Sequence, residues 1–180
     1  MGGRTLRNLG WSLGILLLIG SLAFGLPAVN AALPAARPVP VDRPYPLGSG
    51  VTVVPPPGTR LDVTRSVPGS TLFVLGGVRY LIVVEPFDGT LEDATGQVRH
   101  KITANRGYQV TGPETPATTA QGVVGRLGGY TSPGRNGRYA VFLAGRIDVQ
   151  VTVAGADLEL RPVLAALMTS VTSLAFPAVG

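Results

Sequence analysis

The chain contains one histidine, and this residue is the first candidate for acid–base chemistry. His100 stands between Arg99 and Lys101, inside a segment whose apolar residues recur at helical spacing. A histidine general base needs a nearby nucleophile and an orienting acid. Since the sequence places neither beside it and contains no cysteine, we expect His100 to lie on a solvated helix face. The pattern therefore predicts no catalytic residue and a protein that is not an enzyme, with a hydrolase as the remaining alternative.

Acidic side chains gather at Asp88, Glu92 and Asp93, where they could contact a hard cation. They also precede or begin the predicted helix, and acids at a helix N-terminus complement its dipole without any metal. One histidine and no cysteine exclude most zinc geometries. We therefore expect neither a metal nor a cofactor.

Four glycines in GVVGRLGGY invite comparison with a phosphate-binding loop. Their spacing matches neither GxGxxG nor the P-loop, and GK[ST] does not occur. We interpret Gly122, Gly125, Gly128 and Gly129 as part of a strand that is weakened by glycine, or of a β-bulge.

The segment SPGRNGRY is the one candidate contact site. Pro, Gly and Asn predict a turn, and this turn would present Arg135, Asn136 and Arg138 to solvent. Arginine suits bidentate binding of carboxylate or phosphate. An ordinary exposed turn is the alternative interpretation.

These side chains must be positioned by a folded core, and its clearest element is STLFVLGGVRYLIVVE. Gly76 and Gly77 predict a two-residue hairpin turn. Pairing Leu75 with Val78 places on one face the side chains of Phe73, Leu75, Val78, Tyr80, Ile82 and Val84. The opposite face is also largely apolar, so we expect it to be partly covered.

Two amphipathic helices and further strands follow. Thr90 and Asp93 predict a capping box before the first helix, and Asp157 is the candidate cap of the second. GPETPATTAQ is expected to be a surface loop. In YAVFLAGRIDVQVTV, Ala144 and Gly145 are expected to close a hairpin whose second strand has one solvated face. The fold class is therefore α+β, with a largely antiparallel β-sheet and two helices packed on it.

The elements in this order resemble a known family. GVTVVPPPG, the Gly-Gly hairpin, the helix at DATGQVRHKI, the hairpin GRYAVFLAGRIDVQVTV and the closing helix ending in SVTSLAF are similar to the PsbP-like α/β/α sandwich, particularly small actinobacterial envelope proteins of the LpqN type. The resemblance covers roughly residues 48–176. It implies a non-enzymatic domain that binds envelope components or assists assembly. LpqN-type lipoproteins carry an acylated cysteine, which this chain lacks.

An apolar segment precedes this domain. Residues 1–8 are basic, which favours a cytoplasmic N-terminus, and residues 9–27 are predicted to be a transmembrane anchor or a signal h-region. Val29 and Ala31 before Ala32 form a signal-peptidase pattern. The expected location is the bacterial cytoplasmic membrane with the domain outside, or secretion after cleavage between Ala31 and Ala32.

The remaining boundaries follow from composition. Residues 28–47 are rich in proline and are expected to be a linker, residues 48–176 a single extracytoplasmic domain, and residues 177–180 a tail. The chain has 15 Lys and Arg against 10 Asp and Glu, an excess too small to predict nucleic-acid binding. The expected function is a membrane-tethered interaction or assembly domain whose partner is an envelope protein or molecule. The alternative is a secreted or anchored carrier of a small ligand or lipid.

Overall fold

The computed structural model describes residues 36–178. The expected basic N-terminus, the apolar helix at 9–27 and the peptidase pattern at Val29, Ala31 and Ala32 lie outside these residues. Within residues 36–178, neither helix has the length and apolar character needed to cross a bilayer. The elements are β1 (Ala36–Pro38), β2 (Tyr45–Gly48), β3 (Val51–Val53), β4 (Arg60–Asp62), β5 (Ser70–Leu75), β6 (Val78–Pro86), α3 (Leu91–Thr103), β7 (Gln109–Thr118), β8 (Val124–Ser132), β9 (Arg135–Ala144), β10 (Ile147–Gly155) and α4 (Asp157–Thr172).

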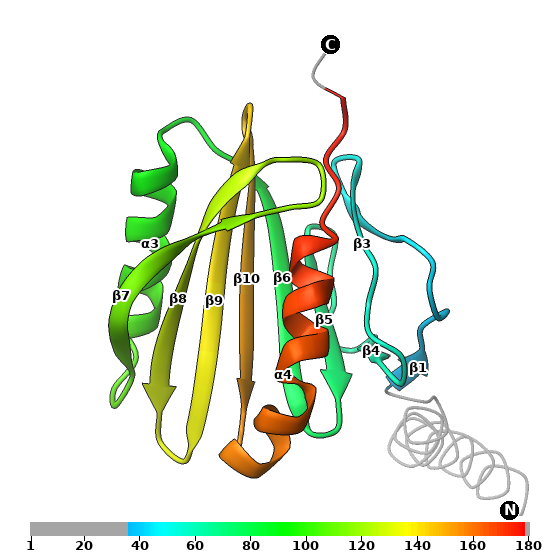
Figure 1. The fold of residues 1–180 in the computed structure, drawn as a ribbon, viewed down its shortest axis with the longest axis vertical. Helices are drawn as coiled ribbons and strands as arrows, with labels where there is room; N and C mark the ends of the chain where they lie inside the picture. Colours follow the sequence, from blue (N-terminus) through cyan, green and yellow to red (C-terminus); the bar gives the residue numbers. More distant parts are fainter. Residues whose placement is uncertain (1–35, 179–180) are drawn as a thin grey trace, which may run out of the picture. The chain divides into compact units, whose positions relative to one another are not determined.

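One antiparallel sheet organises the domain. Its eight strands have the order β1-β4-β5-β6-β10-β9-β8-β7, and β2 and β3 form a separate two-stranded ribbon. The helices lie on opposite faces of the sheet, α4 in front and α3 behind in Figure 1. The predicted α+β class, with a large antiparallel sheet and two helices, is therefore confirmed.

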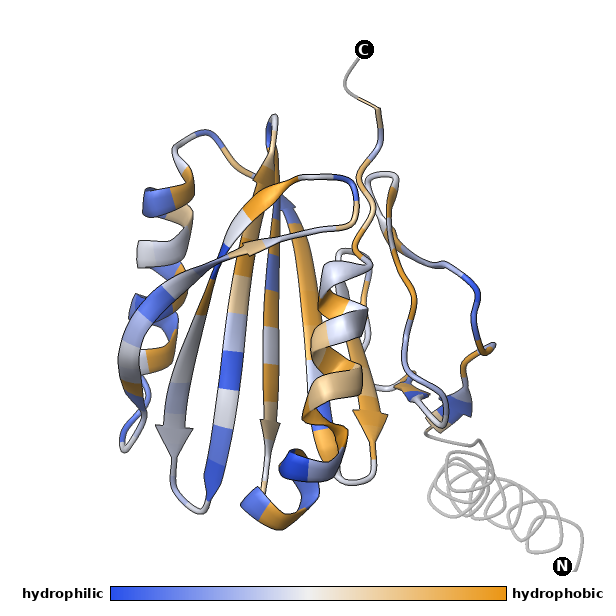
Figure 2. Cartoon of the chain, in the orientation of Figure 1, coloured by the Kyte–Doolittle hydropathy of each residue, from blue (hydrophilic) through white to orange (hydrophobic). Residues whose placement is uncertain are grey.

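Each face of the sheet has its own apolar core because side chains alternate along a strand. On β9, Ala140 and Phe142 belong to the core beneath α4, whereas Tyr139 and Val141 belong to the core beneath α3. Figure 2 shows polar and apolar residues alternating along β10 and an apolar run in the second half of β9. The sequence therefore builds two layers of packing from one sheet.

The β5–β6 hairpin forms as predicted. Gly76 and Gly77 have φ of 55° and 85°, the left-handed conformation that a two-residue type I′ turn requires at both positions. Leu75 pairs with Val78, and the six residues predicted to share a face all lie in or against the core beneath α4.

The capping box of α3 is also present. The Thr90 side chain accepts a hydrogen bond from the Asp93 backbone N–H at 3.2 Å, and Asp93 Oδ2 accepts one from the Thr90 N–H at 3.0 Å. Ala94, Val98 and Ile102 are buried against the sheet. This local sequence fixes where α3 begins and which face it buries.

Three expected loop or linker segments are strands instead. Residues 109–118, which include most of the expected surface loop, form β7, and its Pro113 and Pro116 are tolerated because β7 is the last strand of the sheet and pairs only with β8. The expected linker 28–47 contains β1 and most of β2, so the described domain includes residues before 48. Leu47 is buried in the core. Arg135, Asn136 and Arg138 lie on β9, beyond a turn at Pro133 and Gly134.

Two details near β10 also differ. Ala144 pairs with Ile147, which shifts the turn by one residue to Gly145 and Arg146. The prediction that one face of β10 is solvated is wrong, because Asp148 and Gln150 on that face are buried. They lie between β6, β9 and α3, so long-range packing covers a face that alternation alone marks as polar.

The start of α4 differs by one residue. Its N-cap is Ala156, and Asp157, the expected cap, is the first helical residue. Ala156 N–H donates to Glu159 Oε2 at 3.4 Å. The Glu159 carboxylate therefore accepts the hydrogen bond of the Ala156 N–H, while Ala156 itself has no side-chain oxygen with which to cap the helix.

Candidate functional site

The α3 side of the sheet is only partly covered by its helix. The helix lies against β7, β8 and β9, whereas Leu81 and Val83 of β6 are half-buried on the same face. The apolar residues of this second face of the hairpin were noted in the sequence, and within residues 36–178 neither α3 nor α4 lies directly over them.

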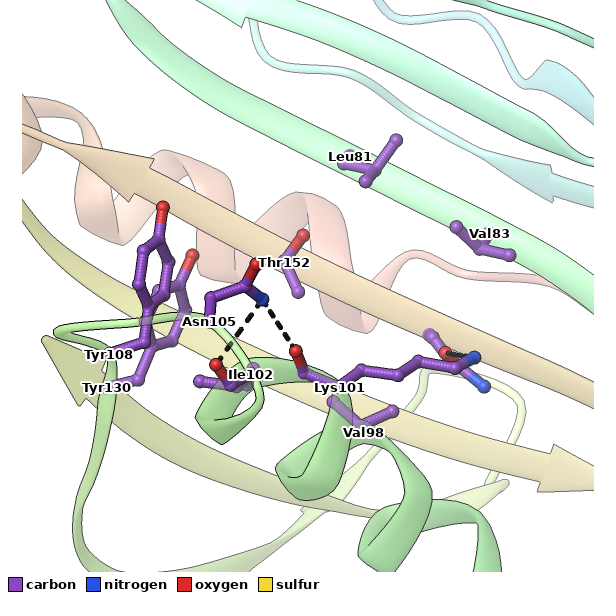
Figure 3. A pocket seen from close by; sticks show the side chains of 10 residues that line it. Leu81, Val83, Val98, Lys101, Ile102, Asn105, Tyr108, Tyr130 and Thr152 are labelled. Atoms are coloured by element: carbon purple, nitrogen blue, oxygen red, sulfur yellow. Dashed lines mark hydrogen bonds between the residues drawn. The ribbon is translucent and has the colours of Figure 1, made fainter. Parts of the chain in front are cut away.

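A groove follows the edge of α3 over this uncovered area. Its larger part has a volume of about 280 Å³ and a smaller part about 130 Å³, and both are lined by Leu81, Tyr108, Tyr130 and Thr152. We call it the α3 groove. Figure 3 shows its larger part, with Leu81 and Val83 on one side and Tyr108 and Tyr130 on the other. The remaining lining residues are Val98, Lys101, Ile102, Asn105 and Gln150 in the larger part, and Leu72, Arg79, Ser132, Arg135 and Ala154 in the smaller one.

Two stacked aromatic rings form one wall. The ring centroids of Tyr108 and Tyr130 are 6.3 Å apart with an interplanar angle of 14°. The ring of Tyr130 lies on Gly137, since a Cβ at that position would overlap it. Burial and the neighbouring Tyr108 raise the pKa of Tyr130 to about 12, while Arg79 and Arg135 lower it. The Tyr130 phenol is therefore a neutral hydrogen-bonding group at physiological pH.

A polar cluster occupies one end of the groove. Lys101 Nζ donates to Gln150 Oε1 at 3.1 Å and to Glu85 Oε1 at 3.3 Å. Gln150 Nε2 donates to Glu85 Oε1 at 2.8 Å and to Asp148 Oδ2 at 2.6 Å. Lys101 and Gln150 thus tie α3 to β6 and β10.

Asp148 is the unusual member of this cluster. It is fully buried, and its Oδ1 has no hydrogen-bond partner among the described residues. Burial raises the pKa of its carboxyl, Gln150 lowers it, Glu85 raises it and Lys101 lowers it. The carboxyl is therefore a buried group with only one of its oxygens hydrogen-bonded, rather than a solvated acid.

The other end of the groove is basic. Arg79 and Arg135 are exposed there, and neither forms an ion pair with any residue in 36–178. The groove therefore combines an apolar middle, an aromatic wall, a neutralised polar end and a free positive end.

The candidate contact residues are separated by the sheet. Arg135 lines the α3 groove. Arg138 lines a pocket with Thr111 and Leu127. It lies on the opposite face, because it follows Arg135 by three positions, an odd number, along an extended strand. Asn136 Nδ2 donates to Asp157 Oδ1 at 3.3 Å, at the start of α4. The structure thus brings only Arg135 to the groove.

The other candidates occupy separate positions. His100 is exposed on α3 beside Gln97 and Lys101, Asp93 caps that helix, and Asp88 pairs with Arg146. Within residues 36–178, no three His, Asp or Glu side chains are grouped so that they could hold a metal ion.

Gly125, Gly128 and Gly129 lie on β8, as interpreted from the sequence, whereas Gly122 precedes the strand and has a φ of 83°. Gly125 and Gly128 lie so close to the rings of Phe142 and Tyr139 that a Cβ at either position would overlap them. These glycines make room for aromatic side chains of the neighbouring strand, so they serve packing within the sheet.

Sequence reasoning did not find most of the groove residues. Tyr108 and Tyr130 lie 22 positions apart. Tyr108 directly precedes β7, and the pairing of β7 with β8 brings the two rings together. Most of β7 was expected to be a loop, so this pairing was not predicted. One signal was available: a glycine directly across from an aromatic residue, as in Gly137 opposite Tyr130.

Comparison with known proteins supports the fold. No protein-family model and no curated protein sequence matches the chain. The solution structure of cyanobacterial PsbP (CyanoP) from Synechocystis sp. PCC 6803 is similar, with a TM-score of 0.56 and 14% identity over 81% of this chain and 99% of that one. PA94 from Pseudomonas aeruginosa, a protein of unknown function, has a TM-score of 0.50 and 12% identity over 76% of this chain and 98% of that one. The PsbP-like fold predicted from the sequence is confirmed, and the likeness to LpqN-type envelope proteins stays a prediction.

Proposed function

We propose that this domain is a non-catalytic binding domain of the bacterial cell envelope, which uses the α3 groove to bind another protein of the envelope. The observation that carries the proposal is the groove itself. It is lined by half-buried Leu81 and Val83 and by exposed Tyr108, which stacks on buried Tyr130, beside a free positive end on a face that α3 leaves partly uncovered. Aromatic and arginine side chains are enriched in protein interfaces.

The groups in the groove favour binding over catalysis. Nucleophilic catalysis needs a nucleophile within hydrogen-bond reach of a base. The hydroxyls that line the groove are Thr152, Ser132 and two tyrosines, and His100, the one imidazole, is exposed on a different face of α3. The amine of Lys101 is already engaged with Glu85 and Gln150.

The location in the envelope rests on the N-terminal sequence. Arg4 and Arg7 precede an uncharged run from Leu9 to Leu26, and the chain contains no cysteine that could carry a lipid. We propose that residues 9–27 hold the domain at the outer face of the cytoplasmic membrane. Secretion after cleavage between Ala31 and Ala32 is the alternative.

A small-ligand or lipid carrier is the second candidate function. The apolar character of the groove favours it, and its two parts, about 280 and 130 Å³, together lie near the lower end of the roughly 300–1,000 Å³ of typical ligand pockets. Because the groove is open to solvent rather than enclosed, side chains of a protein partner fit it better than a ligand that must be fully surrounded.

Crosslinking in intact cells of the native host tests the proposal. The full chain with a C-terminal tag is purified after crosslinking, and bound molecules and the N-terminal peptide are identified by mass spectrometry. We expect a reproducible envelope protein, lost with Leu81→Glu in the groove and retained with Leu158→Glu on the exposed side of α4. Loss with neither variant would place the interface elsewhere, and co-purified lipid without any protein would favour the carrier.

A further inference from the structure

The basic end of the α3 groove has a geometry that selects for a particular partner chemistry. Arg79 on β6 pairs with Ala154 on β10, and Ala154 pairs with Gly137 on β9. Gly137 in turn pairs with Tyr130 on β8. Cross-strand neighbours share a face, so two small residues separate Arg79 from the Tyr130 ring. Arg135 precedes Gly137 by two positions and therefore points to the same side.

These two arginines lack an internal counter-charge. The acids on this face of β6 and β10 are Glu85 and Asp148, and Glu85 already accepts from Lys101 and Gln150. Glu85 lies six residues from Arg79 on the same strand, about 20 Å at the rise of an extended chain. This distance exceeds the Debye length of about 8 Å at physiological salt. The positive charge at this end is therefore available to a bound group.

The apolar part of the groove begins close to the arginines. Leu81 lies two residues after Arg79 on β6, about 7 Å along the strand, and it lines both parts of the groove. In an extended peptide, side chains at positions i and i+2 project from the same side with the same spacing. An apolar residue and an acid two positions apart would thus meet both surfaces at once.

We propose that the partner presents an extended segment with an apolar residue followed two positions later, in either chain direction, by Asp or Glu. The apolar side chain enters the groove between Leu81 and Tyr108, and the carboxylate binds Arg79 and Arg135. This inference rests on the proposed function and specifies which protein segment the groove recognises. Charge complementarity sets the acid, and the spacing along β6 sets the interval.

A peptide array tests this specificity. The probes are fluorescent decapeptides of Gly and Ser that carry one Leu or Phe and one Asp or Glu at separations of one to four positions, with Asn or Gln analogues. The receptor is the full chain in a phosphatidylcholine nanodisc. We expect the tightest binding at a separation of two, and at least about ten-fold weaker binding of the amide analogues, because hydrogen bonds to charged groups are the strong ones.

Matched variants assign the effect to the two arginines. Arg79→Gln combined with Arg135→Gln should bring acid and amide peptides to equal affinity. Arg138→Gln, on the same strand as Arg135 but the opposite face, should leave the preference unchanged. All three arginines are exposed, so folding is retained, and a thermal melt of each variant verifies this.

Several results would overturn the inference. Acid-independent binding, a preference for another separation, or an equal loss with Arg138→Gln would each contradict it. So would binding of phosphatidylglycerol vesicles or oleate in the groove without peptide binding. If the array shows no such preference while crosslinking still captures an envelope protein that is lost with Leu81→Glu, the proposed peptide preference is wrong and the proposed function stands. If crosslinking also captures no envelope protein, the proposed function is wrong as well.

Discussion

Replacing Asp148 with asparagine should stabilise the domain at neutral pH. The Asp148 carboxyl is fully buried, its Oδ1 has no partner among the described residues, and its residue pairs across the sheet with Glu85. A buried polar group without a partner costs about 1–3 kcal/mol, and like charges directly opposite on a sheet are destabilising. Asparagine keeps the acceptor for Gln150 and can donate toward Glu85. We expect the free energy of unfolding at pH 7.5 to rise by about 1 kcal/mol.

The same substitution should change the pH dependence of stability. Burial raises the pKa of the Asp148 carboxyl above its unfolded value of about 3.9. As pH rises, the unfolded chain therefore releases this proton first, and between the two pKa values the folded state holds more protons. Its free energy of unfolding falls through this window and stays lower above the folded-state pKa. Asp148→Asn removes this decline.

Urea unfolding of the full chain at several pH values between 4 and 8 measures both effects. The stabilisation of Asp148→Asn relative to the unchanged chain should grow as pH rises. Asp88→Asn is the matched control, because that exposed carboxylate pairs only with Arg146 at the surface and such pairs contribute little. A variant that is less stable at pH 7.5, or a difference that is constant with pH, would refute the reasoning.

Four further substitutions test the packing and the cap of α3. Leu167→Ala should lower the free energy of unfolding by about 2–5 kcal/mol because Leu167 is fully buried. Leu158→Ala, at an 88% exposed residue, should change it by less than about 0.5 kcal/mol. Chemical denaturation compares the two variants, and equal losses would contradict the core assignment. Gly137→Ala should cost about 1–3 kcal/mol because its methyl group overlaps the Tyr130 ring, and shifted Tyr130 NMR resonances should accompany the loss. Thr90→Ala should cost about 1 kcal/mol by removing the N-cap of α3, with faster amide exchange at Asp93; unchanged exchange would count against the cap.

Local patterns were sufficient to predict several elements. The β5–β6 hairpin rests on two glycines, which adopt the positive φ of its turn without steric cost, and the start of α3 rests on a capping box between residues three positions apart. In both, the determining contacts lie within a few residues, so the sequence contains the whole cause. The α+β class followed from them.

The elements that were mispredicted depend on distant partners. The β7 segment is polar and contains two prolines, and only its position at the edge of the sheet beside β8 makes it a strand. The polar alternation of β10 suggested a solvated face, but α3 and Lys101 cover Asp148 and Gln150. Arg135 was nominated as part of a turn, and its role beside Arg79 became visible only through the register of β6, β10 and β9. Contacts between strands far apart in the sequence, which no local pattern specifies, therefore assemble the groove.

Position-resolved photo-crosslinking tests the central claim most directly. Benzoylphenylalanine is placed at Tyr108, on the aromatic wall of the α3 groove, or at Leu158, on the exposed side of α4, and cells of the native host are irradiated. Our account predicts that Tyr108 forms an adduct with one envelope protein, and that Leu158 does not. Adducts at Leu158 alone, or at both positions with equal yield, would contradict the assignment of the groove as the binding surface.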